Sequence, residues 1–292
     1  MKKTIRGMKM TQANEPRHFG IEDFGKWYLD NFIEVYDNAS EQYDKRKARY
    51  QEFLEEWPIE RLKAMTIDEY IVGNGENSKG TFCYELDYGK YSGIGLGIRG
   101  GTPLSKFGLM WSKEDNAYRD QQGLILADQV EERFSKLKQD LVEILEKGLA
   151  LDFADPVFNW ETSSNEFTRR PAFVTKLLCI YSFPNQILVG VNFKRNQDVW
   201  DKFVPFEIQG GPYKQNHDVG MLIQQNFPEL SFELQTFIDW QYVNAEFEAK
   251  SDEVKQEVEI RDDSNEENDL LQGLSNEDKQ LVMQLIERLK NK

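Results

Sequence analysis

The sequence predicts an α/β (α+β) fold in which a central, mostly antiparallel sheet with a glycine-rich hairpin is packed by several amphipathic helices. Three patterns support this prediction. Apolar residues recur every three or four positions between Phe24 and Val35, and again across residues 124–149, which is typical of helices with one buried face. Between these regions, apolar and other residues alternate across residues 82–88 and 94–98, which is typical of strands.

The composition indicates a folded, acidic protein. The chain of 292 residues carries 36 Lys and Arg against 51 Asp and Glu, a net charge of −15. Aromatic residues make up 13% of the chain, which argues for a packed core and against disorder. An acidic protein is a poor non-specific DNA binder, because affinity for phosphates depends on clustered cations. A local basic face in the body of the chain stays open as an alternative.

The two cysteines point to a reducing compartment. Cys83 and Cys179 each lie in an apolar run without a second Cys or a His nearby. We expect two buried thiols, with no disulfide framework and no zinc site, as in a cytoplasmic protein. The basic N-terminus lacks the apolar core of a signal peptide. No apolar run reaches the ~18 residues of a membrane span, so no membrane partner is expected.

The first part of the chain is expected to be helical. After a flexible segment at 1–20, a helical pattern occupies residues 21–57, and Pro58 ends it. The basic run 44–49 within this pattern fits a solvated helix face better than a phosphate contact. Residues 66–69 have the spacing of a capping box, which predicts the start of another short helix.

The glycine-rich stretch is the centre of the predicted sheet. Residues 82–88 are expected to form a strand with an aromatic face. Within residues 93–98, apolar residues alternate with glycines, which gives a strand one apolar and one bare face. A bare face permits close approach of a helix, a second strand or a ligand, and residues 124–149 are a candidate for such a helix. Residues 106–111 are expected to add a further strand.

The second part of the chain predicts a helix over 124–149, an apolar segment over 172–181, a short strand over 187–191 and a helix over 229–249. Four segments follow from composition and periodicity: a flexible N-terminus at 1–20, a mixed α/β domain at 21–250, an acidic linker at 251–273 and an amphipathic C-terminal helix at 274–292. A helix beyond a linker suits docking on a partner.

The literal G-x-G-x-x-G at Gly95, Gly97 and Gly100 does not predict a dinucleotide site. Such a site needs a strand before the glycines and a helix directly after them. Here Gly101 and Pro103 follow, and both disfavour a helix interior. No G-K-[ST] occurs anywhere in the chain, so the sequence lacks a Walker-type phosphate loop.

Catalytic signatures are weak. His18 and His217 are the two histidines, and neither accompanies a nucleophile motif; we expect His217 to be an exposed loop residue. Carboxylates at Glu85 and Asp87 with Lys90 have the residue types of a metal-dependent nuclease, but their spacing is common by chance. The prediction is a non-enzyme with no catalytic residue, no metal site and no cofactor, and a cryptic nuclease is kept as an alternative.

Binding groups are more plausible than catalytic ones. Cations supply phosphate contacts, and aromatic faces stack unpaired or flipped bases. Two basic groups meet this description, one beside the glycine stretch and one interleaved with Phe167 and Phe173. The candidate nucleic-acid-binding residues are Arg99, Lys106, Lys113, Arg169, Arg170 and Lys176, and the candidate close-approach glycines are Gly93, Gly95, Gly97, Gly100 and Gly101. Ordinary surface charge over an aromatic core is the competing interpretation.

Several phrases resemble the N-terminal region of McrB-type restriction ATPases, the motor subunits of modification-dependent restriction systems in bacteria. The resemblance covers about half of the chain, through order and spacing and not through one diagnostic motif. The matching segments are Glu55-Glu-Trp-Pro-Ile-Glu-Arg-Leu62, Met65-Thr-Ile-Asp-Glu-Tyr70, Thr81-Phe-Cys-Tyr-Glu-Leu86, Gly95-Leu-Gly-Ile-Arg-Gly-Gly101, Lys106-Phe-Gly108 and Phe173-Val-Thr-Lys-Leu-Leu-Cys-Ile-Tyr181 with Pro184.

This resemblance implies a non-catalytic DNA-recognition or specificity module of a restriction or phage-defence system, reading a modified duplex. It also implies an AAA+ motor, in cis or in trans, and a separate nuclease subunit as partners. This sequence departs from the family because it contains no motor domain. The alternative is a protein-interaction adaptor that docks an ATPase or nuclease through its C-terminal helix.

Overall fold

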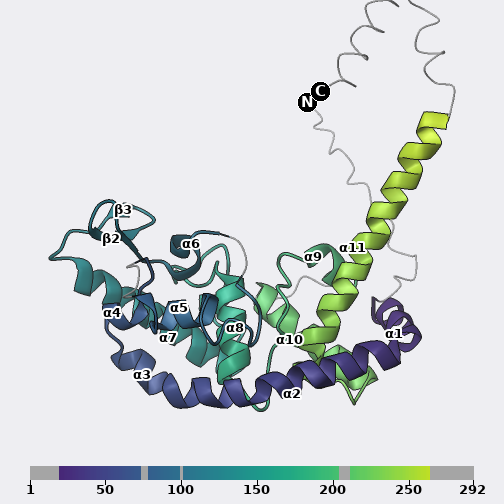
Figure 1. The fold of residues 1–292 in the computed structure, drawn as a ribbon, viewed down its shortest axis with the longest axis horizontal. Helices are drawn as coiled ribbons and strands as arrows, with labels where there is room; N and C mark the ends of the chain where they lie inside the picture. Colours follow the sequence, from purple (N-terminus) through teal and green to yellow (C-terminus); the bar gives the residue numbers. More distant parts are fainter. Residues whose placement is uncertain (1–19, 74–77, 99–100, 204–210, 264–292) are drawn as a thin grey trace, which may run out of the picture. The chain divides into compact units, whose positions relative to one another are not determined.

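The computed structural model describes residues 20–73, 78–98, 101–203 and 211–263. Internal contacts divide the chain into a unit that ends at Val243 and a unit that begins at Asn244, and each is described by itself. The first unit is mostly helical and carries one small antiparallel sheet (Figure 1). The predicted flexible segment up to residue 19 and the predicted helix at 274–292 lie outside the described residues.

The described elements follow one another along the chain with short connections. The helices are α1 (Gly20–Asp30), α2 (Phe32–Glu56), α3 (Ile59–Ala64), α4 (Ile67–Tyr70), α5 (Phe82–Asp87), α6 (Pro103–Phe107), α7 (Val130–Leu149), α8 (Pro171–Tyr181), α9 (Gln197–Trp200), α10 (Gly211–Asn226) and α11 (Phe232–Asp263), with a 3-10 turn at Pro156–Phe158. The strands are β1 (Met110–Ser112), β2 (Ala117–Asp120) and β3 (Gly123–Leu124).

Two apolar cores stabilise the first unit. The first core packs α2, α5, α7 and α8 together, through residues such as Phe53, Phe82 and Leu177. The second core packs α1, α9, α10 and α11 around Trp200 and Ile238. Each fully buried side chain of this size contributes about 1.5–3 kcal/mol relative to an exposed one.

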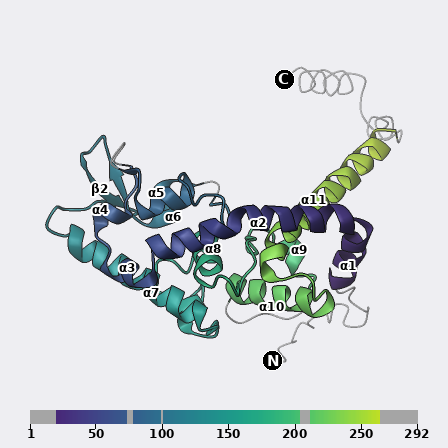
Figure 2. The same ribbon diagram turned by 60° about the horizontal axis from the view of Figure 1, so that its bottom comes forward.

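The long helix α2 contributes to both cores. Its first half places Val35 and Ala39 in the second core, and its second half places Tyr50 and Phe53 in the first core. Figure 2 shows α2 running past α8 along its whole length from the α1 end to the α3 end. The stretch of α2 between the two sets of buried residues, which includes Arg46, therefore lies where the cores meet.

The sheet is small and lies at the edge of the helical body, where Figure 1 shows it beside α4 and α6. It is antiparallel in the order β1-β2-β3, and its register pairs Trp111 with Tyr118. These two rings meet edge to face at 4.8 Å between centroids. The prediction of a mixed helical and antiparallel fold is confirmed at this coarse level, whereas a central sheet with a glycine-rich hairpin is not what the structure shows.

Residues 82–88 form helix α5 and not the predicted strand. Phe82, Cys83 and Leu86 are fully buried, whereas Tyr88 is exposed. Burial therefore follows the helical spacing of one and four residues, although the aromatic residues alternate in sequence. The carboxylate of Glu85 supports this turn, because it accepts hydrogen bonds from the backbone N–H groups of Gly80 and Lys90, at 3.0 and 2.9 Å.

Residues 93–98 form a loop and not the predicted strand. The alternation of burial is present, since Ile94 and Ile98 are buried, but no neighbouring strand pairs with the segment. The predicted strand over 187–191 is also a loop. There the side chain of Asn216 replaces a strand partner: it accepts from Val189 N at 2.8 Å and donates to the carbonyl oxygens of Val189 and Val191.

The predicted strand over 106–111 is divided between two elements. Helix α6 ends at Phe107, Gly108 takes a left-handed conformation with φ of 84°, and β1 begins at Met110. Glycine suits this position because the left-handed region strains other residues. Pro103 lies in the first turn of α6, where proline is tolerated, so a short helix does follow Gly101.

The helical predictions are confirmed where the periodic pattern is long. Helices α1 and α2 cover the predicted pattern of 21–57, and α7 covers most of 124–149. The capping box is also present: Thr66 Oγ1 accepts from Glu69 N, and the carboxylate of Glu69 accepts from Thr66 N. Cys83 and Cys179 are both buried free thiols, as expected.

The acidic stretch predicted as a linker is helical as far as Asp263, where α11 ends. Its Glu, Lys, Gln and Val residues include strong helix formers, which a prediction based on charge alone does not weigh. Residues 264–273 of the stretch lie outside the described residues. None of the helices in the described ranges is both long enough and apolar enough to cross a bilayer.

Helices α7 and α8 approach closely at Gly148. A Cβ atom on this residue would lie 2.6 Å from Cδ2 of Leu178, which is fully buried in the first core. We expect Gly148→Ala to lower the free energy of unfolding by about 1–3 kcal/mol through overpacking, although alanine is the better helix former by about 0.5–1 kcal/mol. Urea denaturation measures the change.

The matched control is the same substitution in a Leu178→Ala background. There the obstructing methyl groups are gone, and Gly148→Ala should be neutral or stabilising. A stabilising effect of Gly148→Ala in the wild-type background would contradict the close α7–α8 contact.

Candidate functional site

The predicted cations do not form one exposed basic surface. Lys106 of α6 makes a buried ion pair, with its Nζ 2.7 Å from Oδ2 of Asp87 and both side chains less than 10% exposed. This pair joins α6 to α5. Lys106 is therefore occupied within the fold and does not project from a hairpin toward a ligand.

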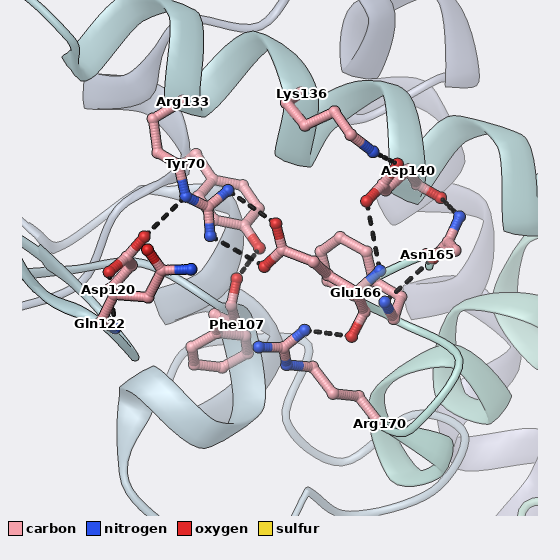
Figure 3. A network of polar contacts seen from close by, with 11 residues as sticks. Tyr70, Phe107, Asp120, Gln122, Arg133, Lys136, Asp140, Asn165, Glu166 and Arg170 are labelled. Carbon is pink, nitrogen blue, oxygen red and sulfur yellow. Dashed lines mark hydrogen bonds and ion pairs between the residues drawn. The ribbon is translucent and has the colours of Figure 1, made fainter. Parts of the chain in front are cut away.

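Arg170 is also a structural residue. Its guanidinium donates to the carbonyl oxygens of Ser105, at 3.1 Å, and Glu166, and burial lowers the pKa of the group. Figure 3 shows this contact within a larger polar network around Glu166. In that network Arg133 of α7 pairs with Asp120 of β2 and with Glu166, both at 2.7 Å. The network ties the sheet and the segment before α8 to α7.

Lys113 and Arg169 are the two predicted cations that the structure shows exposed. Lys113 lies in the turn between β1 and β2, and Arg169 precedes α8, where its Nε donates to the carbonyl oxygen of Trp160 at 3.0 Å. Arg99 and Gly100 lie outside the described residues. The structure thus leaves two separate exposed cations from the predicted set.

Lys176 has an unexpected role beneath the glycine loop, defined here as residues 92–97. Its side chain is fully buried in α8, and its ammonium group donates to three backbone carbonyls of the loop region: those of Tyr91 at 2.9 Å, Ser92 at 3.1 Å and Ile94 at 2.8 Å. Burial lowers the pKa of Lys176 to about 7, and the nearby Asp87 opposes that shift. The cation fixes the loop from below.

The upper side of the glycine loop lines a cavity of about 330 Å³. This cavity, called the junction pocket below, lies where the two cores meet. It is bounded by α2, by the start of α8, by the 190–196 segment and by α11. The lining residues are Arg46, Ser92, Gly93, Gly95, Leu96, Gly97, Ala172, Gly190, Asn192, Arg195, Asn196, Thr236, Phe237 and Trp240. The volume falls within the range of small-molecule sites.

Glycines allow the walls of the pocket to approach each other. Gly95 has a φ of 59°, and its N–H donates to the hydroxyl of Tyr50 at 2.7 Å. A Cβ on Gly190 would lie 2.4 Å from Cγ2 of Thr236 and 3.3 Å from the carbonyl carbon of Gly95. The predicted bare face thus packs against α8 and the 190 segment, and not against α7 as the sequence suggested.

The lining carries two cations and no carboxylate, although the chain has a net charge of −15. Arg46 lies over the ring of Phe237 at 5.0 Å and donates to the Oε1 of Gln42 at 2.8 Å. In the described part of the chain, neither Arg46 nor Arg195 forms an ion pair. Two guanidinium groups therefore face the junction pocket with their charge uncompensated.

The acidic residue between the pocket-lining positions of α11 does not change this balance. Asp239 is fully buried, and neither of its carboxyl oxygens has a hydrogen-bond partner within the described ranges. Burial raises the pKa of Asp239 well above its ordinary value, so the group is protonated at neutral pH. The region around the junction pocket is consequently net positive.

The residues behind the catalytic alternatives are engaged in the fold. His217 lies in α10 and not in an exposed loop; its Nδ1 is 2.8 Å from the carbonyl oxygen of Ile187. Glu85 binds backbone amides, Asp87 pairs with Lys106, and Lys90 pairs with Glu56. No group of three His, Cys, Asp or Glu side chains suitable for a metal ion occurs among the residues that the structure describes.

Sequence reasoning missed most of the junction pocket. Arg46 belongs to the basic run that was interpreted as a solvated helix face. Trp240 was counted as part of an apolar stripe, yet its side chain is 40% exposed. Asn192, Arg195 and Asn196 lie in a segment without a recognisable motif. The one signal that pointed here was the bare face of the glycine stretch.

Because the folded state disfavours the charged form of Lys176, stability should depend on pH. In the unfolded chain the group keeps a pKa near 10.5, so between about pH 7 and 10.5 the unfolded state binds a proton that the folded state has lost. This residue therefore makes the free energy of unfolding rise with pH in that window, by up to about 1.4 kcal/mol per pH unit.

Lys176→Met should remove this contribution, which denaturation at several pH values between 7 and 9 measures. The exposed Lys113→Met is the control and should leave the pH dependence unchanged. Parallel curves for wild type and Lys176→Met would contradict a depressed pKa at this position.

Comparison with known proteins adds nothing to this geometry. No family model matches the chain, no curated protein matches it, and no solved structure matches it.

Proposed function

We propose that this chain is a non-catalytic DNA-recognition or specificity module of a restriction or phage-defence system, and that it reads modified DNA. The resemblance to the N-terminal region of McrB-type ATPases supports this proposal through the sequence. The junction pocket supports it through geometry.

The observation that carries the proposal is the chemistry of the pocket wall. Arg46 and Arg195 present uncompensated positive charge, and Phe237 and Trp240 present aromatic surface on the same cavity. Cations contact phosphates, and aromatic faces stack bases, so this combination suits a nucleic acid. Since the lining contains no carboxylate, the acidity of the whole chain does not repel an anion at this place.

The proposed setting follows from the same module. It acts in the cytoplasm, where its two free thiols stay reduced. It works with an AAA+ motor, in cis or in trans, and with a nuclease subunit that cuts the DNA.

The test is DNA binding at two salt concentrations with unmodified, methylated and hydroxymethylated duplexes. Arg195→Gln should weaken binding by roughly 10-fold or more, because hydrogen bonds to charged groups contribute about 1.5–3 kcal/mol. It should also reduce the slope of log affinity against log salt by about 0.9 for each lost phosphate contact. Fluorescence anisotropy measures both quantities.

The matched control is Lys113→Gln, which removes an exposed cation from the turn between β1 and β2. This variant should bind as the wild type does. An absence of binding to all three duplexes would reject the DNA function, and equal losses in both variants would show that the pocket is not the contact.

An adaptor function is the second candidate, and an exposed apolar patch favours it. Leu29, Phe32 and Ile33, around the turn between α1 and α2, are 66%, 39% and 76% exposed. An adaptor would bind an AAA+ ATPase or nuclease through such a surface or through residues 274–292. Deletion of 274–292 or the substitution Ile33→Ser should then abolish co-purification with that partner and leave DNA binding intact. Unchanged co-purification in both variants would reject the adaptor function.

A further inference from the structure

We propose that the junction pocket binds a single nucleoside monophosphate unit, with its phosphate at Arg46 and Arg195 and its base against Trp240. The unit comes either from a free nucleotide or from an unpaired nucleotide of a strand. The strand source rests on the proposed function, whereas the ligand chemistry follows from the pocket itself.

The phosphate end is defined by donors without acceptors. The two guanidinium groups form no ion pair, as described above. In addition, the backbone N–H groups of Gly93, Leu96 and Gly97 donate to no acceptor within the described ranges. A loop with free amides and a left-handed residue makes an anion-binding concavity, and Gly95 supplies that conformation.

Lys176 leaves these amides free for a ligand. It binds the carbonyl oxygens of the loop from the buried side, and it donates no hydrogen bond into the pocket. The carbonyl dipoles of Tyr91, Ser92 and Ile94 therefore point toward the ammonium group, away from an incoming anion. This arrangement removes the repulsion that carbonyl oxygens would otherwise exert on a phosphate.

The base end is defined by aromatic and amide groups. Trp240 keeps an exposed ring surface at the edge of the cavity, and Phe237 is covered on one face by Arg46. Asn192 accepts from the backbone N–H of Arg195 through Oδ1, which leaves its amide hydrogens free to meet a base edge. Stacking on one aromatic side chain contributes about 1–3 kcal/mol per base.

The size of the cavity limits the ligand. About 330 Å³ accommodates one small molecule but not a peptide segment or an acyl chain. Within that volume, the lining supplies charge at one set of residues and an aromatic face at another. A nucleoside monophosphate carries both matching groups, whereas inorganic phosphate or a nucleoside carries one.

The experiment is calorimetric titration of the full chain with adenosine 5′-monophosphate, cytidine 5′-monophosphate, adenosine and inorganic phosphate. At least one monophosphate should bind about 10-fold more tightly than adenosine or phosphate alone. Arg195→Gln should weaken the monophosphate by about 10-fold and leave adenosine unchanged. Trp240→Ala should weaken monophosphate and adenosine alike, by about 5- to 100-fold, and leave phosphate unchanged.

Lys113→Gln is again the control, and the thermal midpoint of each variant shows that it folds. The proposal is overturned if neither monophosphate binds saturably at millimolar concentration, or if Arg195→Gln and Trp240→Ala both bind as the wild type does.

Two further arms separate the ligand source. If the monophosphate displaces a duplex that contains one unpaired nucleotide, the strand supplies the unit. If the monophosphate binds and no DNA binds, the pocket assignment holds and the DNA function fails. If DNA binds and neither pocket variant changes that binding or any monophosphate binding, the pocket assignment fails and the DNA function holds.

Discussion

The ammonium group of Lys176 is the interaction on which the glycine loop depends. It satisfies three carbonyl oxygens that have no strand partner, at 2.8 to 3.1 Å. A buried charge is costly unless hydrogen bonds compensate it, and here the compensation comes from backbone groups that would otherwise be unpaired themselves. The lysine and the irregular loop thus stabilise each other, which explains why residues 92–97 do not need a neighbouring strand.

A fixed loop gives the junction pocket its floor, and α2 gives it a wall. Because α2 belongs to both cores, the position of Arg46 is set by buried residues on either side along the helix. The pocket therefore has rigid boundaries on these two sides. Its positive charge arises locally, from two arginines without carboxylate neighbours in the lining, and is independent of the acidic average of the chain.

Sequence patterns predicted the long helices well and the short elements poorly. The repeat of apolar residues in α1, α2 and α7 extends over enough turns to exclude a strand. In residues 82–88 the alternation of aromatic residues fits a strand, and only burial by the surrounding helices selects α5. Lys176 shows why the site was hard to predict: its charge suggested a phosphate contact, whereas its partners are distant backbone carbonyls that no local pattern reveals.

The most direct test of this account is the amide NMR spectrum of the chain during titration with a nucleoside monophosphate. The account predicts that the signals of Gly93, Leu96 and Gly97 shift together with the indole signal of Trp240, because these groups line one cavity. Shifts confined to the β1–β2 turn around Lys113, or the absence of saturable shifts at the glycine loop, would contradict a phosphate-binding pocket at the junction of the two cores.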